Sequence, residues 1–370
     1  MGQGCSSLLA WLLRLLPPGP AHHLATTLLR LPFPVGGKAV VDEFEVRGNR
    51  FRNRVGIAAG LDKNAACLAG LERLGAGFVE VGTVLVEPWE GLSLRPNLRR
   101  LPGTGGIWNR LGVPSHGLRQ VRKNLAAFPR AKRRGLLVGC NIGPHPGNLK
   151  RARVPSEYIE IARGELEHLA ESLFEHADFF VVNLSSPNTP GLRGLLEDES
   201  LCRALLAPVK RLLVRLDAAS RPDRSTLLLL KLPPEDTGLR PWTAESLGRI
   251  VRPLGAEEAC DGFVAVNTSA RLALESVKDA SRDFPGGVSG APLHPPAVRT
   301  VELLRQIVGP DRLIIGCGGI LQPEHALDFL RAGADLVELY SGLIYRGPGL
   351  VRRCAEAVKR YGGPSKRSCG

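Results

Sequence analysis

Five polar side chains follow short apolar segments of this sequence, Lys63 four residues after its segment and the others directly: Lys63, Asn141, Asn183, Lys231 and Asn267. A single asparagine in such a position usually completes a turn or caps a helix. Three asparagines and two lysines in equivalent positions are better explained by a common site. Amide side chains both donate and accept hydrogen bonds, and lysine supplies a positive charge. The pattern therefore indicates one functional site.

Two further segments of this kind carry Gly318-Gly319 and Tyr340-Ser341. Backbone N–H groups of a glycine-rich loop can surround a phosphate group. We therefore expect a cofactor or substrate that bears phosphate. Lys231 leaves two possibilities open: a Schiff base, as in an aldolase, or a permanent charge that stabilises electron density on a flavin ring.

The apolar segments alternate with helical patterns from residue 55 onward. Continuous apolar runs are typical of strands buried on both faces, as in a parallel sheet. Repeated strand–helix units predict an α/β fold, a (β/α)8 TIM barrel, with an open doubly wound sheet as the weaker alternative. In such a barrel the active site lies at the carboxyl ends of the strands. The predicted strands are 55–59, 78–81, 136–140, 179–182, 227–230, 263–266, 313–316 and 336–340.

Helical spacing predicts helices at 157–173, with Ser156 as its cap, and at 297–308, ended by Gly309. Two more are predicted at 322–331 and 350–361. The first 38 residues stand apart as two short helices, 8–16 and 21–31, divided by the proline-rich segment 17–20. The first helix is apolar nearly all round but too short to span a bilayer. It either packs on the barrel or dips into a membrane interface.

Composition excludes several classes of protein. The net charge of +13 comes from scattered residues without interleaved aromatic side chains, which argues against nucleic-acid binding. The eight cysteines have no CxxC spacing, which predicts reduced thiols and no metal site. We expect three parts: an N-terminal helical extension (1–38), the barrel (39–362) and a flexible basic tail (363–370).

The chain resembles the class 2, quinone-dependent and membrane-associated dihydroorotate dehydrogenases over nearly its whole length. The resemblance rests on ordered motifs, among them GIAAGLDKN (56–64), VVNLSSPNTPGLR (181–193), IIGCGGI (314–320) and AGADLVELYSGLIYRGP (332–348). Ser186 stands where the soluble class 1 enzymes have cysteine, which favours class 2. The resemblance implies oxidation of dihydroorotate to orotate with flavin mononucleotide (FMN), a quinone as acceptor, and a peripheral place on a membrane. That membrane would be the cytoplasmic face of a bacterial inner membrane, or the inner mitochondrial membrane in a eukaryote.

The resemblance also implies roles for individual residues. Ser186 matches the catalytic base, with Thr189 as its proton relay, and His22 and Arg100 match positions that line a quinone tunnel. The residues expected to hold FMN are Ala59, Gly60, Lys63, Thr83, Asn141, Asn183, Lys231, Gly290, Gly319, Tyr340 and Ser341. Those expected to hold dihydroorotate are Lys63, Asn109, Asn183, Asn188, Asn267 and Thr268.

Three segments depart from the family pattern. Gly112-Val113-Pro114 lacks a usual aromatic residue, Pro144-His145-Pro146 replaces a segment that contains lysine, and Val266 stands where threonine is common. Three alternatives remain at this point. One is a soluble flavin-dependent relative with another electron acceptor or another dihydropyrimidine. The second is a Schiff-base aldolase on the same barrel, and the third is a barrel that binds flavin without turnover.

Overall fold

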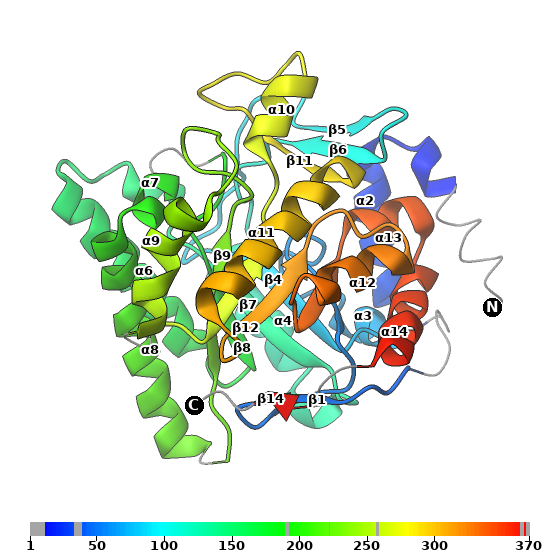
Figure 1. Cartoon of the computed structure of the whole chain (residues 1–370), viewed down its shortest axis with the longest axis horizontal. Helices are drawn as coiled ribbons and strands as arrows, with labels where there is room; N and C mark the ends of the chain where they lie inside the picture. The colour runs from blue at the N-terminus through cyan, green and yellow to red at the C-terminus, as the bar shows by residue number, and fades with distance from the viewer. Residues whose placement is uncertain are drawn as a thin grey trace.

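The centre of the molecule is a closed barrel of parallel strands (Figure 1). The structure is a computed structural model that describes residues 12–32, 39–188, 192–221, 223–256, 259–362 and 366–367. All eight predicted strands are present and close into one ring, which confirms the TIM barrel. Around the barrel the order is β10 (Gly262–Ala265), β12 (Leu313–Cys317), β13 (Leu336–Leu339), β3 (Val55–Ile57), β4 (Phe78–Val84), β7 (Leu137–Ile142), β8 (Phe179–Asn183) and β9 (Leu227–Leu232).

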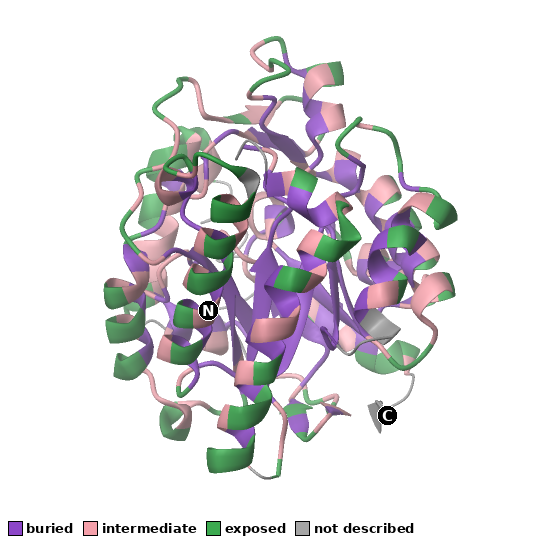
Figure 2. Ribbon diagram, turned by 90° about the vertical axis from the view of Figure 1, so that its left-hand side faces the viewer, coloured by how far each residue is buried: buried purple, intermediate pink, exposed green. Residues whose placement is uncertain are grey.

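Helices surround the barrel and turn one face toward it. Figure 2 shows buried strands at the centre and helices whose outer faces are exposed. Such amphipathic helices form because an apolar stripe packs on the strands while the polar face stays in water. The main ones are α3 (Leu68–Arg73), α4 (Gly117–Ala127), α6 (Pro155–Leu173), α8 (Glu199–Ser220), α9 (Ala244–Ala256), α11 (His294–Val308), α12 (Pro323–Arg331) and α14 (Gly349–Tyr361).

Two predicted helix starts were wrong. Helix α6 begins at Pro155, so Ser156 lies inside its first turn and makes no capping hydrogen bond. Helix α2 (Pro18–Arg30) begins within the proline-rich segment that was expected to separate two helices. Proline fits the first turn of a helix because the N–H groups there have no partner within the helix. In both cases a proline starts the helix rather than preceding it.

The N-terminal extension packs against the barrel through α2. The Arg73 guanidinium, on α3, donates to the carbonyl oxygens of Leu29 (2.9 Å) and Leu31 (2.6 Å). Residues 12–15 are also helical, whereas the start of the predicted helix 8–16 lies outside the described residues. Within the described ranges, no helix has the length and apolar character needed to cross a membrane.

Two small sheets, which the sequence pattern did not indicate, cover the ends of the barrel (Figure 1). At the carboxyl ends of the strands lies an antiparallel sheet of β5 (Leu98–Leu101), β6 (Gly106–Asn109) and β11 (Gly287–Gly290). At the opposite end, β1 (Phe44–Val46) and β2 (Asn49–Phe51) form a hairpin, and β14 (Lys366–Arg367), from the predicted tail, runs parallel to β1. The rings of Phe51 and Phe78 meet at 5.4 Å between centroids, so the hairpin closes the apolar interior.

Aspartates tie neighbouring barrel strands together where the strands begin. Asp178, Asp261 and Asp335 each accept the N–H of the second residue of an adjacent strand, from Val138 (2.8 Å), Leu228 (2.7 Å) and Ile314 (2.9 Å) respectively. Each carboxylate also meets a cation from another element. Asp261 contacts Lys210 on α8 at 2.7 Å and Arg47 in the β1–β2 turn. These pairs fix the helices and the hairpin to the bottom of the barrel.

We expect Asp261→Ala to lower the free energy of unfolding by about 3–5 kcal/mol, the usual cost of removing one partner of a buried ion pair. Both Asp261 and Lys210 are buried, so the substitution leaves the Lys210 ammonium without its counter-charge. Denaturant unfolding followed by circular dichroism measures the change. Asp279→Ala is the matched control, since Asp279 pairs with Arg99 at the surface at 2.8 Å and should cost under about 1 kcal/mol. Equal losses in the two variants would contradict the role of Asp261.

Candidate active site

Four of the five polar residues predicted at the strand ends, all except Lys63, belong to one continuous hydrogen-bond network. Asn267 Nδ2 donates to Ser185 Oγ (2.9 Å), and Ser185 Oγ donates to Asn183 Oδ1 (3.0 Å). Asn183 Nδ2 donates to Thr83 Oγ1 (3.0 Å), and Thr83 Oγ1 donates to Asn141 Oδ1 (2.6 Å). Each amide is thereby fixed in one orientation. The network joins β4, β7, β8 and β10, and Ser185 is a member that the sequence analysis did not include.

The network continues to Lys231 through Glu80. Asn141 Nδ2 donates to the Glu80 carboxylate, and Lys231 Nζ contacts Glu80 Oε2 at 3.0 Å. Burial acts to lower the pKa of Lys231, but the adjacent Glu80 carboxylate acts in the opposite direction, and the pKa is raised above its usual value. A Schiff-base lysine needs a lowered pKa because the neutral amine is the nucleophile. The environment of Lys231 therefore argues against the aldolase alternative.

Lys63 occupies the turn after β3, on the side of the barrel mouth opposite Lys231. Its Nζ donates to the carbonyl oxygen of Gly60 at 2.9 Å, and the Tyr340 hydroxyl donates to the same oxygen at 3.3 Å. Burial lowers the pKa of Lys63 to about 8, although Asp62 acts in the opposite direction. Lys63 is thus a cation that an anionic ligand would stabilise. Ala59, also predicted for the site, is the residue before Gly60 in this turn.

The predicted phosphate loop is a set of glycines that leaves no room for side chains. A Cβ at Gly290 would meet the Gly105 carbonyl oxygen at 2.2 Å, and a Cβ at Gly319 would meet the Gly290 carbonyl oxygen at 2.7 Å. Both glycines have positive φ. Ser341, which begins the short helix α13 (Ser341–Arg346), lies beside them, and its Oγ is 2.9 Å from Ser289 Oγ. The structure therefore brings together the strand ends of β11, β12 and β13.

Two histidines that the sequence analysis did not include support this loop from behind. His325 Nδ1 lies 3.0 Å from the Gly319 carbonyl oxygen, and His294 Nδ1 lies 3.4 Å from that of Gly318. The two rings stack with centroids 4.3 Å apart. Because the C=O and N–H of a trans peptide point in opposite directions, these contacts turn the amides of residues 319 and 320 away from the histidines. The loop is thereby held in one conformation.

Ser186 follows β8 and is buried near some of the residues expected to bind substrate. The Asn188 N–H donates to Ser186 Oγ at 3.3 Å. Asn188 Oδ1 is also buried, and within the described part of the chain it has no hydrogen-bond partner. Asn109, on β6, donates to the Gly287 carbonyl oxygen at 3.4 Å, and Thr268 packs against Gly287. Thr189, the expected relay, lies outside the described residues.

The residues expected at a quinone tunnel lie where the N-terminal extension meets the barrel. His22, on α2, has its pKa lowered to about 4 by burial first and then by the charges of Lys63 and His23. Arg100, on β5, donates to the carbonyl oxygens of Leu16 (2.7 Å) and Arg14 (3.0 Å). Its guanidinium therefore satisfies the carboxyl end of the helical segment 12–15.

Trp89 connects two of the segments that depart from the family pattern. Its Nε1 donates to the Gly112 carbonyl oxygen at 2.9 Å, and its ring meets that of His145 edge to face at 5.2 Å. His145 in turn caps α5 (Pro146–Leu149) by accepting the Asn148 N–H at 3.2 Å. Val113 has a φ of 55°, which is unfavourable for a branched side chain. The altered segments therefore form one packed unit beside the barrel mouth.

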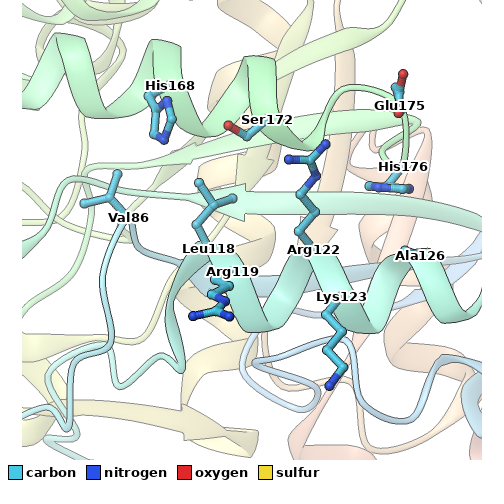
Figure 3. Close-up of a pocket in the computed structure, with 10 residues that line it drawn as sticks. All are labelled: Val86, Leu118, Arg119, Arg122, Lys123, Ala126, His168, Ser172, Glu175 and His176. Carbon is cyan, nitrogen blue, oxygen red and sulfur yellow. The ribbon is translucent and has the colours of Figure 1, made fainter.

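A surface groove of about 710 Å³ lies between α4 and α6 and is separate from the predicted site (Figure 3). Arg119, Arg122 and Lys123 line it from α4, and His168 and Glu175 line the other side. None of its lining residues belongs to the network or to the glycine loop. Within the described ranges, no three His, Cys, Asp or Glu side chains are grouped so that they could bind a metal ion.

Known proteins of one family resemble this chain in sequence and in fold. The profile of the family described as "Dihydroorotate dehydrogenase" matches residues 42–361. A protein of Paracidovorax citrulli named "Dihydroorotate dehydrogenase (quinone)" is 37% identical over 93% of this chain and 94% of its own length. A protein of Delftia acidovorans with the same name is 39% identical over 86% of each chain. The crystal structure of an Eimeria tenella DHODH in complex with ferulenol superposes with a TM-score of 0.78 at 29% identity, over 92% of this chain and 90% of that one.

Proposed function

The chain belongs to the dihydroorotate dehydrogenase family, and from this premise we propose that it oxidises dihydroorotate to orotate and passes the electrons to a quinone. The names of the relatives from Paracidovorax citrulli and Delftia acidovorans support both the reaction and the acceptor. The observation that carries the proposal is the single network that joins Asn267, Asn183, Thr83 and Asn141 to the charged Lys231 at one end of the barrel.

FMN is the proposed cofactor, and two features of the site fit it. Gly290 and Gly319 form a cradle that any Cβ would fill, which suits a phosphate group approached by backbone amides. Lys231 supplies a permanent positive charge, which suits a ring that gains electron density. When bound, FMN would accept the hydride that leaves C6 of dihydroorotate and release electrons to the quinone. The proposed FMN contacts are Ala59, Gly60, Lys63, Thr83, Asn141, Asn183, Lys231, Gly290, Gly319, Tyr340 and Ser341.

The substrate is held by amides and a lysine in this proposal. Dihydroorotate has ring C=O and N–H groups side by side, and asparagine matches both because it donates and accepts. The buried Asn188 Oδ1 needs a donor, which a ring N–H of the substrate supplies. Lys63 complements the substrate carboxylate. The proposed substrate contacts are Lys63, Asn109, Asn183, Asn188, Asn267 and Thr268.

Ser186 is the proposed base and takes the proton from C5 of dihydroorotate at its Oγ. The Asn188 N–H at 3.3 Å orients this oxygen and stabilises negative charge that develops on it. Burial of Ser186 excludes water that would compete for the proton. Thr189 is proposed to carry the proton onward.

We also propose that the N-terminal extension admits the quinone and rests on a membrane surface. Three leucines of its first described segment, Leu12, Leu15 and Leu16, are 47%, 66% and 37% exposed. An exposed apolar surface of this kind favours a bilayer interface, where long-tailed quinones reside. His22, on α2, and Arg100, on β5, are the proposed tunnel residues. The membrane concerned is the one that carries the quinone of the source cell.

Purified full-length protein should contain flavin that dihydroorotate bleaches under anaerobic conditions. A short-tailed quinone, or a long-tailed quinone in lipid vesicles, should then restore the flavin absorbance with turnover, whereas fumarate and NAD⁺ should not. Stopped-flow absorbance measures both steps. Bleaching followed by faster reoxidation with fumarate would contradict the quinone acceptor. A flavin that dihydroorotate leaves unchanged would contradict the substrate.

A further inference from the structure

A second carboxyl group, that of Glu338, lies beside the Glu80–Lys231 pair inside the barrel. Glu80 is on β4, Lys231 on β9 and Glu338 on β13, and all three are buried. Glu338 is the register partner of Cys317 on the neighbouring strand β12, and its carboxyl group interacts with that of Glu80. Cys317 contributes no charge, because burial raises the pKa of its thiol far above neutral pH. Two carboxyl groups therefore share one cation.

The hydrogen bonds of the two glutamates differ sharply. Both carboxylate oxygens of Glu80 accept from Lys231 Nζ, at 3.2 and 3.0 Å, and Oε1 also accepts from Asn141. Within the described part of the chain, neither buried oxygen of Glu338 accepts a hydrogen bond from any N–H or O–H donor. A buried carboxylate without donors is very unfavourable. A carboxylic acid in the same place supplies its own donor and can bond to Glu80.

The electrostatics lead to the same distribution of charge. Burial and the negative charge of Glu80 raise the pKa of Glu338 well above its ordinary value. Burial acts in the same direction on Glu80, but Lys231 and the hydrogen bonds from Glu338 and Asn141 outweigh it and lower the pKa of Glu80. The two opposite shifts favour a proton on Glu338 over one on Glu80.

We propose that Glu338 is a positioning residue, whose carboxylic acid donates a hydrogen bond to Glu80 and thereby holds the Lys231 ammonium in place at the floor of the active site. With this proton, Lys231, Glu80 and Glu338 form a unit of zero net charge. Without it, the unit would carry a net negative charge directly below the site. The importance of this unit for the cofactor rests on the proposed function, whereas the proton itself can be tested in flavin-free protein.

The first experiment detects the proton. Infrared spectra of full-length, flavin-free protein at pH 7 should contain the C=O band of a buried carboxylic acid, and Glu338→Gln should remove it. Unfolding gives a second readout. Free glutamate titrates near pH 4.3, so above this pH the unfolded chain releases a proton that folded Glu338 retains. Relative to Glu338→Gln, the unfolding constant of the wild type should therefore rise about tenfold per pH unit from pH 5 upward.

Glu245→Gln is the matched control, because it makes the same chemical change at an exposed helical position. It should keep the infrared band and the wild-type pH profile. Loss of the band in Glu338→Gln together with a flatter pH profile supports the proposal. An unchanged band, or profiles that run parallel from pH 5 to 8, would show that Glu338 is ionised and would overturn it.

The second experiment tests positioning in the protein that holds its flavin. The amide introduced by Glu338→Gln keeps an N–H donor to Glu80, whereas the leucine of Glu338→Leu has a similar size and no donor. The flavin affinity of Glu338→Gln should stay within a few-fold of that of the wild type. Glu338→Leu should bind flavin about tenfold more weakly and change its reduction potential, because the hydrogen bond to the charged Glu80 is lost. Equal affinities and potentials in the two variants would overturn positioning. If the leucine variant does not fold, the infrared and pH results on Glu338→Gln still decide whether Glu338 carries the proton. A wild type that binds no flavin would refute the cofactor proposal alone.

Discussion

Flavin reduction by dihydroorotate should slow by on the order of 10²–10⁴ in Ser186→Ala, the usual contribution of a positioned general base. Ser186 is buried, and its Oγ is oriented by the Asn188 N–H at 3.3 Å. The substitution removes the oxygen that takes the C5 proton and leaves the amide contacts to the substrate in place. Orotate affinity should therefore stay within a few-fold of the wild type. Anaerobic stopped-flow bleaching measures the rate, and orotate titration measures the affinity.

The neighbouring serine provides a matched control. Ser185 Oγ links Asn267 to Asn183 and has no proposed part in proton transfer. Ser185→Ala should weaken orotate binding and leave the bleaching rate at saturating dihydroorotate within about tenfold of the wild type. Ser186→Cys should retain activity with a lower apparent pKa, because a free thiol ionises near pH 8.5. A Ser186→Ala rate within a few-fold of the wild type would remove Ser186 from the mechanism.

The barrel could be predicted because its strands are buried on both faces. Strands such as β8 and β9 are continuous apolar runs, and the helices between them keep an amphipathic repeat. The small sheet of β5, β6 and β11 could not be predicted, since it pairs segments roughly 180 residues apart whose own sequences are short and glycine-rich. Helix starts were missed where proline occupies the first turn, as at Pro155.

The candidate site was predictable to the extent that it depends on position along a strand. Asn141, Asn183, Lys231 and Asn267 follow apolar runs, and the closed barrel alone brings them together. Glu80 was missed because it lies within an apolar run, although a charged residue inside such a run is itself a signal. His294 and His325 were missed for a different reason, since their function depends on stacking between two elements that are not adjacent in sequence.

Lys231→Met should lose flavin and also destabilise the protein, by about 3–5 kcal/mol at neutral pH. The methionine fills the space of the lysine stem but leaves the Glu80 carboxylate buried without its cation, which lies at 3.0 Å in the wild type. The pKa of Glu80, lowered mainly by Lys231 against the effect of burial, should then rise. When the pKa of a carboxyl group is higher in the folded state than in the unfolded state, the free energy of unfolding falls as the pH rises from the unfolded-state pKa toward the folded-state pKa. The variant should therefore be markedly more stable at pH 5 than at pH 8, as denaturant unfolding will measure.

A second substitution separates the structural loss from the loss of flavin. In Glu80→Gln/Lys231→Met the buried site carries neither the carboxylate nor the ammonium, so most of the lost stability should return and the pH dependence should flatten. Flavin should still be lost, or bound at a lower reduction potential, because no cation remains to stabilise electron density added to its ring. The absorbance of the purified double variant, with added FMN, measures this. If a stable double variant has the flavin affinity and reduction potential of the wild type, Lys231 maintains the fold and does not act on the cofactor. A substrate adduct trapped on wild-type Lys231 by borohydride would restore the aldolase alternative.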